Sequence, residues 1–257
     1  MNRRQIIQIG NALPPGVTAE QFALAQLASI VAWPVVAKWG VSAAATGFQD
    51  RLERGAVRMA NGQTAVAGRF FDTSDGTGTG YSIQGVPMAL VLPTFDTSGD
   101  FTVGVRFAPG ALTIAGGTWG GFALGSYTSA NNAWRLENDD SGRFRMGAPG
   151  GLQTNYADYA GPVVTASQMM YAVLRFFRAS GKLNMRINGV YEQNLQNNAL
   201  VAATFATELA FGLYWDFSTS TTKYRPTQLV KAVAANAALT GDDLTALENY
   251  LKSATVE

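Results

Sequence analysis

The fold is decided by the stretch Met170–Tyr191, which reads MYAVLRFFRASGKLNMRINGVY. Its first eight residues form a long apolar run of the kind that fills a central strand buried on both faces. Ala179–Gly181 is a turn signal, and Lys182–Ile187 then alternates between polar and apolar residues, as a half-buried strand does. Asn188–Gly189 is typical of a type I′ turn between paired strands. The stretch therefore predicts neighbouring antiparallel strands joined by tight turns.

Similar signals occur on both sides of this stretch. The segment Phe101–Phe107 alternates, so that its two Phe and two Val residues share one face. A turn signal at Asn138–Gly142 separates two short runs, which predicts a hairpin. Further strands are expected at Trp119–Leu124, Ala133–Glu137, Arg143–Met146, Glu208–Tyr214 and Gln228–Val233. Many short strands divided by Gly, Ser, Asp and Asn favour an all-β antiparallel sandwich over a fold of alternating strands and helices.

Two helices are expected outside these strands. Thr18 and Gln21 have the spacing of a capping box, and the apolar residues that follow predict a helix of about four turns that ends near Trp33–Pro34. A second capping signal at Thr240–Asp243 precedes Leu244, Leu247 and Leu251, which predicts a short amphipathic helix to near Lys252. The fold class is therefore a β-sandwich with an N-terminal helical arm and a short C-terminal helix.

The composition excludes several kinds of chemistry. The chain has 257 residues, 14% of them charged, and a net charge of +1, which gives no reason to expect binding to nucleic acid or to an anionic membrane. It contains no Cys, which excludes disulfides, thiolate nucleophiles and zinc–thiolate sites. It contains no His, which excludes His-based triads and His-ligated metals.

We divide the chain into an N-terminal arm, residues 1–46, and a sandwich, residues 47–257. The uncharged run 21–37 is shorter than a membrane span and contains Pro34, so we expect no membrane-spanning helix. A helix that is apolar nearly all round must be buried, either in its own domain or against another chain. We expect the arm to anchor the protein to a partner or to form a homo-oligomer through Phe22, Leu24, Leu27, Ile30, Val31 and Trp33.

Three stretches together resemble motifs of the concanavalin A-like, laminin-G-like lectin sandwich. They are Phe101–Phe107 (FTVGVRF), Phe176–Tyr191 (FFRASGKLNMRINGVY) and Leu229–Leu251, in which NAALTGDDL follows the closing strand. Their order and spacing match the family over about residues 65–254. The resemblance implies a jelly-roll arrangement of two antiparallel sheets.

The segment Ala12–Thr18 (ALPPGVT) is similar to the lead-in of lectin-like proteins encoded in bacteriophage structural operons. This resemblance implies a non-enzymatic virion structural protein, either a head decoration or fibre protein or a tail or baseplate component. Its partners would be other capsid or tail proteins. Met1–Arg4 is similar to the start of a secretory signal, but Gln5–Gly10 is too short and too polar for the apolar region of one, which agrees with assembly in the host cytoplasm and a location in the virion.

The alternative function is a carbohydrate-binding module that recognises host surface glycans. Lectin sandwiches hold sugars with exposed aromatic rings beside Asn and Asp side chains. The candidate residues are Tyr127, Asn131, Trp134, Tyr214, Trp215 and Asp216. Burial in the core or at a subunit interface is the more common place for Trp and Tyr, so each candidate also has a purely structural interpretation.

A glycoside hydrolase is the third hypothesis. Glucanases of the resembled family use two glutamates that flank an aspartate on one strand. The nearest match here, Glu137–Gly142 (ENDDSG), has Gly142 in place of the second glutamate, so we expect no catalytic residues.

Calcium is the one metal that the sequence leaves open, and no other cofactor is expected. Asp72 and Asp75 offer hard oxygen ligands in a Gly-rich loop, and Asp96 and Asp100 flank another loop. Asx-turn hydrogen bonds explain both loops without a metal.

Overall fold

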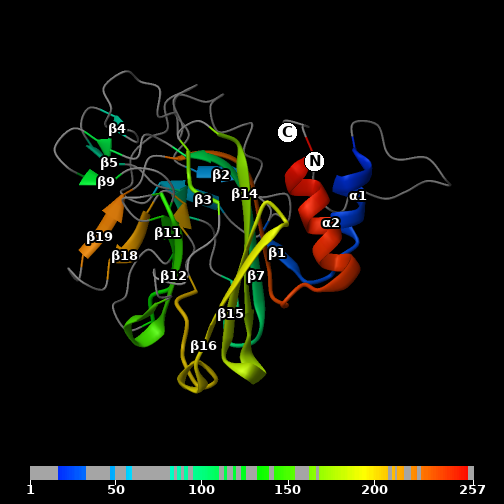
Figure 1. Ribbon diagram of the computed structural model, residues 1–257. Helices are drawn as coiled ribbons and strands as arrows, with labels where there is room; N and C mark the ends of the chain where they lie inside the picture. Colours follow the sequence, from blue (N-terminus) through cyan, green and yellow to red (C-terminus); the bar gives the residue numbers. More distant parts are fainter. Residues whose placement is uncertain are drawn as a thin grey trace.

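The apolar run at Met170 forms β14 (Met170–Phe177), an inner strand of a six-stranded sheet in the computed structural model. The sheet has the order β1-β20-β7-β14-β15-β16, and each pairing in it is antiparallel (Figure 1). The other members are β1 (Ile30–Ala32), β7 (Phe101–Pro109), β15 (Lys182–Ile187), β16 (Tyr191–Gln196) and β20 (Thr227–Ala235). The prediction from the opening stretch is thereby confirmed.

An eight-stranded sheet in the order β13-β12-β11-β10-β17-β6-β3-β2 faces it. Its strands are β2 (Gly47–Gln49), β3 (Ala56–Met59), β6 (Leu90–Val91), β10 (Ala123–Gly125), β11 (Arg135–Asn138), β12 (Phe144–Ala148), β13 (Leu152–Gln153) and β17 (Ala210–Phe211). The predicted hairpin around Asn138–Gly142 is present as β11 and β12. Three two-stranded sheets join β4 (Ser82–Ile83) to β5 (Val86–Pro87), β8 (Thr113–Ile114) to β9 (Thr118–Trp119), and β18 (Leu213–Asp216) to β19 (Thr221–Tyr224).

The structure describes residues 17–32, 47–49, 56–59, 82–83, 86–87, 90–91, 95–109, 113–114, 118–119, 123–125, 132–138, 142–153, 162–165, 168–207, 210–211, 213–216, 221–224 and 227–253. Among the helices in these ranges, none has the length and apolar character needed to cross a membrane.

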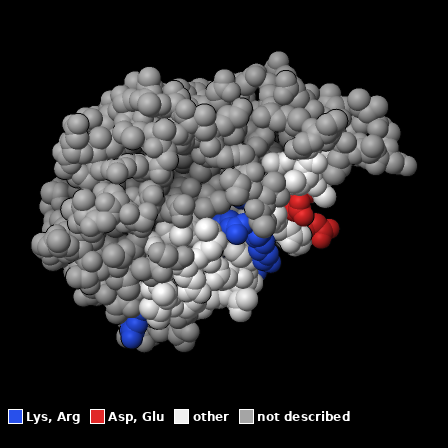
Figure 2. All heavy atoms as spheres, turned by 90° about the horizontal axis from the view of Figure 1, so that it is seen from above, with Lys and Arg blue, Asp and Glu red and all other residues white. Residues whose placement is uncertain are grey.

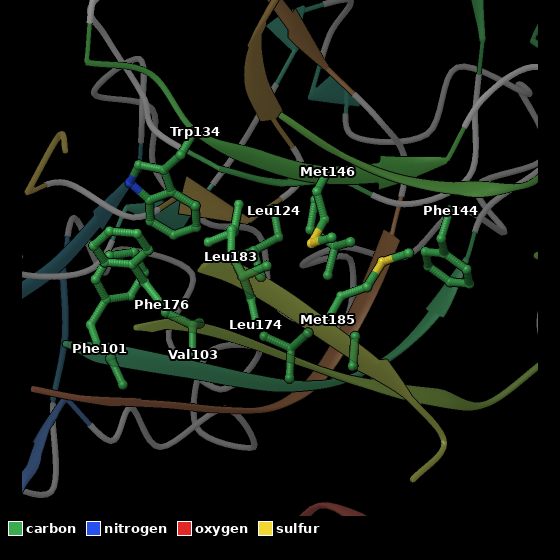
Figure 3. Packing of buried hydrophobic residues seen from close by; sticks show 14 of the residues in the cluster. Phe101, Val103, Leu124, Trp134, Phe144, Met146, Leu174, Phe176, Leu183 and Met185 are labelled. Carbon is green, nitrogen blue, oxygen red and sulfur yellow. The ribbon is translucent and has the colours of Figure 1, made fainter. Parts of the chain in front are cut away.

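The main core lies between the two large sheets. Alternation along β7 turns Phe101, Val103, Val105 and Phe107 into this core, and all four are fully buried. Figure 3 shows side chains of β7, β14 and β15 packed against Leu124, Trp134, Phe144 and Met146 of the facing layer. The two inner faces thus interdigitate as in other sandwiches, and the predicted antiparallel β-sandwich is confirmed.

A third layer covers the opposite face of the six-stranded sheet. Tyr171 and Val173 of β14 point away from the main core and pack with α1 (Ala19–Ala25) and α2 (Gly241–Lys252) in a second apolar cluster. Figure 1 shows both helices together on this side of the sheet. The central strand is therefore buried on both faces, as its apolar run predicts.

The capping box at the start of α1 is present. Gln21 N donates to Thr18 Oγ1 at 3.2 Å, and Thr18 N donates to Gln21 Oε1 at 3.0 Å. The predicted length of about four turns is wrong, because the helix ends at Ala25. The β-branched residues Ile30 and Val31 instead form the edge strand β1, paired with β20. A strand places Ile30 in the helix-side cluster and Val31 in the main core, so both side chains are buried.

The predicted docking of this segment on another molecule needs correction. Leu24 and Ile30 are 0% exposed and Val31 is 8% exposed within this single chain, so these side chains are not available to a partner. Phe22 and Leu27 are partly buried against the same cluster. Trp33 and the predicted domain boundary, residues 40–47, fall mostly outside the described ranges, so the division at residue 46 stays a prediction.

Helix α2 is present as predicted, and two cations hold its carboxyl end. Lys231 of β20 is 1% exposed, and its Nζ donates to the carbonyl oxygens of Tyr250 at 2.7 Å and Ser253 at 2.9 Å. Arg106 of β7 donates to the carbonyl oxygens of Lys252 and Ser253. Positive charge is favourable at this end of a helix, where the last carbonyl groups lack partners within the helix.

One predicted strand is divided in two. The segment Glu208–Tyr214 contains β17, which belongs to the eight-stranded sheet, and the start of β18, which pairs with β19 instead. Gly212 stands between the two strands in the sequence, and a glycine inside a strand pattern is a sign of such a break.

A buried threonine connects β7 to the segment that leads into α2, and this gives a first prediction. Thr102 is 1% exposed; its Oγ1 donates to Ala237 O at 2.6 Å and accepts from Leu239 N at 2.9 Å. Thr102→Val keeps the shape and leaves both backbone groups without this partner. We expect the free energy of unfolding, measured by urea denaturation, to fall by about 1–3 kcal/mol.

Thr245→Val is the matched control. Thr245 also donates to a backbone oxygen, that of Gly241 at 3.0 Å, but it is exposed on α2. Its effect should stay within about 0.5 kcal/mol. Equal losses for the two variants would contradict the role assigned to Thr102.

Candidate functional site

One side of β14, β15 and β16 presents a group of charged and amide side chains. We call it the outer face: the side chains of these three strands that point away from the main core, beyond the part of the sheet covered by α1 and α2. Its members are Arg175, Phe177, Lys182, Asn184, Arg186, Glu192, Asn194 and Gln196. The side chains that alternate with them on β15, Leu183, Met185 and Ile187, are buried in the core.

Strand register arranges the outer face in rows that cross the strands. Arg175, Asn184 and Asn194 are neighbours in one row. Phe177, Lys182 and Gln196 form the next row towards one end of the strands. Arg186 and Glu192 are opposite each other in the row towards the other end. Directly opposed side chains on adjacent strands interact most strongly, so each row is a continuous chemical surface.

The middle row is held by hydrogen bonds between side chains. Arg175 Nε and Nη2 donate to Asn184 Oδ1 at 2.9 and 2.6 Å, and Arg175 Nη1 donates to Leu239 O at 3.0 Å. Asn184 Nδ2 in turn donates to Asn194 Oδ1 at 2.8 Å and to Glu192 Oε1 at 2.6 Å. Asn184 is 0% exposed and Arg175 6% exposed, so this network forms a rigid base under the more exposed groups of β16.

Arg186 connects the outer face to helix α2. Its Nη1 donates to Glu192 Oε2 at 2.7 Å, and its Nε donates to Glu248 Oε1 at 2.9 Å. Its Nη2 donates to Gly189 O at 2.8 Å in the turn between β15 and β16. The guanidinium therefore fixes a strand, a turn and a helix relative to one another.

The turn at Asn188–Gly189 leaves room for a buried tyrosine hydroxyl. Asn188 and Gly189 have φ of 53° and 70°, which agrees with the predicted turn chemistry, although Val190 also lies in the loop. A Cβ on Gly189 would lie 2.4 Å from Tyr171 Oη. Burial and the charge of Glu248 raise the pKa of Tyr171 to about 12, so its hydroxyl stays protonated.

The Glu192 carboxylate is held in its charged form by hydrogen bonds from Asn184 and Arg186. Burial raises its pKa, but the hydrogen bonds from Arg186 and Asn184 and the charges of Arg175 and Arg186 outweigh burial, so the pKa lies below its usual value of 4.5. Its side chain is 38% exposed. Asn194 and Gln196 are exposed on the same side of β16. The outer face thus offers fixed donors and acceptors for binding.

A second polar cluster lies in the eight-stranded sheet. Arg135 Nε is 3.0 Å from Glu137 Oε1, and Arg145 Nε donates to the same oxygen. The three side chains are only 3%, 0% and 11% exposed, respectively. The glutamate that most nearly matches the glucanase motif is therefore a buried member of an ion cluster with two guanidinium groups.

The structure corrects one predicted glycan-binding residue. Trp134 is 0% exposed, its Nε1 donates to Ala206 O at 3.0 Å, and its ring lies 5.6 Å from that of Phe101. It is a core residue because its large apolar surface fills the space between the sheets while its one polar group finds a backbone acceptor.

The other predicted glycan residues are not brought to the outer face. Tyr214, Trp215 and Asp216 lie on β18, which packs beside β10 at the other sheet. Tyr127 and Asn131 lie outside the described residues, so the predicted cluster as a whole stays a prediction.

The metal prediction is tested only in part. Asp72 and Asp75 lie outside the described residues. At the second loop, Asp96 Oδ1 accepts from Ser98 N at 2.8 Å, which is the expected Asx turn, and Asp100 Oδ1 accepts from Arg178 N at 2.7 Å. Within the described ranges, no three acidic side chains come together in a group able to hold a metal ion.

Comparisons with known proteins find similarity only in structure. No family model and no curated protein matches the chain. A Trypanosoma rangeli sialidase in complex with 2,3-difluoro-KDN aligns over 86% of this chain and 32% of that chain, with a TM-score of 0.57 and 15% identity. A botulinum neurotoxin type C, studied for its interaction with two ganglioside molecules, aligns over 68% of this chain and 42% of that one, with a TM-score of 0.48 and 12% identity. The chain has an antiparallel β-sandwich fold, and the alignment with the sialidase agrees with it at the level of the fold.

A third similar structure is the heptameric SAP-like pentraxin of Limulus polyphemus. It aligns over 59% of this chain and 71% of that chain, with a TM-score of 0.42 and 13% identity. The chain spans about two fifths of the neurotoxin and one third of the sialidase. At these identities the likeness concerns the fold alone, and the function must be argued from the chain's own residues.

Sequence reasoning missed the outer face, although its signal was present. Lys182, Asn184 and Arg186 alternate with apolar residues, which places them on one side of a strand. Glu192, Asn194 and Gln196 repeat this period on the next strand. What the sequence did not indicate is the register that puts Asn194 opposite Asn184.

The bound state of Glu192 gives a pH prediction. Because its pKa is lower in the folded protein, its stabilising contribution is complete above pH 4.5 and is lost as the pH falls through the lowered value. Glu192→Gln should lower the melting temperature by about 1–3 °C at neutral pH, and the difference from the parent protein should shrink in acid.

Gln196→Ala is the control for this pH series, because it removes an uncharged side chain from the same strand and face. Its melting curve should run parallel to that of the parent at every pH. A difference for Glu192→Gln that grows in acid would show that Glu192 is not held in its charged form.

Proposed function

We propose that this chain is a non-catalytic carbohydrate-binding module whose contact surface is the outer face of β14–β16. One observation carries the proposal: Glu192, Asn194 and Gln196 are exposed at alternate positions along β16, beside the buried network of Asn184 and Arg175. The lectin-type sandwich is compatible with this function and does not by itself establish it.

The chemistry of these three side chains suits sugar hydroxyl groups. A hydroxyl both donates and accepts a hydrogen bond, and an Asn or Gln amide also offers both. Glu192 adds a carboxylate acceptor whose position is fixed by Arg186 and Asn184. Since the base is already ordered, binding loses less conformational entropy than it would on mobile side chains.

The carboxylates of the described residues support binding over catalysis. A glycosidase needs one carboxyl group that gives up a proton and a second that attacks or activates water. Glu192 is bound to Arg186 and Asn184, and Glu137 is buried between Arg135 and Arg145. Both glutamates thus have roles in ion pairs.

The virion role stays a prediction from the resemblance at Ala12–Thr18. Most of that segment lies outside the described residues, and no comparison bears on a phage origin, a capsid or tail partner, or a location in the virion. A glycan-binding module is compatible with such a role, because a virion protein can present it to a host surface.

The proposal predicts that removing two amides from the outer face weakens binding to polysaccharide. Titration of the full chain against a panel of neutral and acidic polysaccharides identifies a ligand. The variant Asn194→Ala/Gln196→Ala should then weaken its affinity about tenfold, as expected for the loss of two hydrogen bonds of ordinary strength.

Asn249→Ala is the matched control, since it removes an exposed amide from α2, away from the exposed side chains of β16. It should bind like the parent chain. Failure to bind any polysaccharide, or equal losses in the two variants, would overturn the proposed function.

A further inference from the structure

The charge on the outer face indicates which class of saccharide it binds. Resting on the proposed function, we infer that the ligand is an anionic saccharide and that Lys182 contacts its negative group.

The other charges of this region balance one another. Arg186 pairs with Glu192 at 2.7 Å and with Glu248 at 2.9 Å. Arg175 pairs with Glu192 at 3.2 Å. Two cations and two anions therefore form one connected group, and each of their charged ends already has a hydrogen-bonded partner.

Lys182 is the remaining cation of the outer face. Its Nζ lies 4.4 Å from the centre of the Phe177 ring, and within the described part of the chain it forms no ion pair. It is half-buried, and Gln196 is its neighbour across the β15–β16 pairing. Lys182 therefore lies between Gln196 of β16 and Phe177 of β14, with its ammonium group over the Phe177 ring.

The Phe177 ring positions the ammonium group of Lys182 but accepts none of its hydrogen bonds in the usual way. A cation–π contact attracts the charge to the ring face but supplies no hydrogen-bond acceptor, so donors of the ammonium group remain for an oxygen ligand. A ligand carboxylate or sulfate would complete this pair, while Asn194 and Gln196 contact hydroxyl groups of the same saccharide. A neutral saccharide could accept a hydrogen bond from Lys182 but would lack the charge attraction that an anionic group adds.

The low net charge of the chain favours a local contact over a broad electrostatic field. Seen from above, a small group of Lys and Arg lies beside a small group of Asp and Glu, among uncharged residues (Figure 2). The net charge of the whole chain is only +1. Preference for an anion should therefore depend on a single residue and not on total charge.

The test compares three soluble polysaccharides on the full chain by calorimetric titration: neutral dextran, carboxylated polygalacturonate and dextran sulfate. We expect at least one of the two charged polymers to bind more tightly than dextran, with an affinity that falls as salt is added. Lys182→Gln should weaken that binding about three- to fivefold and reduce the preference of the chain for the charged polymer over dextran. Lys182→Arg should retain most of the preference.

Lys252→Gln is the matched control. Lys252 is another lysine above an aromatic ring, with its Nζ 5.6 Å from the centre of the Tyr171 ring, but it is exposed and lies on α2. Its loss should leave the preference intact, and an equal effect of the two variants would show that only net charge matters. Equal binding of neutral and charged polymers, unaffected by Lys182→Gln, would overturn this inference and leave the proposed function standing. No binding to any polymer would count against both.

Discussion

The structure depends on the burial of β7 and β14 on both faces. Side chains that alternate along these strands enter two different apolar clusters, one between the sheets and one beneath the helices. Gly104 shows how closely the helix layer approaches, since a Cβ there would lie 3.0 Å from Leu251 Cδ1. A shift of register by one residue would exchange the two clusters and place Arg106 and Thr102 in the main core. The two layers therefore enforce a single pairing of the strands.

This constraint also accounts for the outer face. Helices α1 and α2 cover β20, β7 and part of β14, so the polar residues of β15 and β16 extend beyond them. Arg175 lies at the boundary, where it bonds both to Leu239 beside the helix layer and to Asn184 on the next strand. The apolar layer ends and the polar network begins at one guanidinium group, which gives the surface its fixed geometry.

The sequence predicted which side of each strand is buried better than it predicted which segments contact one another. Alternation at Phe101–Phe107 and Lys182–Ile187 indicated the buried faces, because period 2 is a property of the strand itself. The length of α1 was overestimated, since the pairing of Ile30 with Ala235 joins residues far apart in the chain. Trp134 was assigned to a glycan site for the same reason: its burial depends on Phe101 and Ala206, which no local pattern reveals. The outer face was missed because the register of β15 and β16 depends on the length of their loop, which has three residues, Asn188 to Val190, and not the two of the predicted turn.

The capped carboxyl end of α2 has a consequence for how the molecule comes apart. Lys231 and Arg106 belong to β20 and β7, the two strands at the centre of the helix side. If α2 were to detach, the ammonium group of Lys231 and the guanidinium group of Arg106 would lose these acceptors. The apolar side chains beneath the helix would become exposed to water in the same step. We therefore expect α2 to unfold together with β7 and β20, as one cooperative unit.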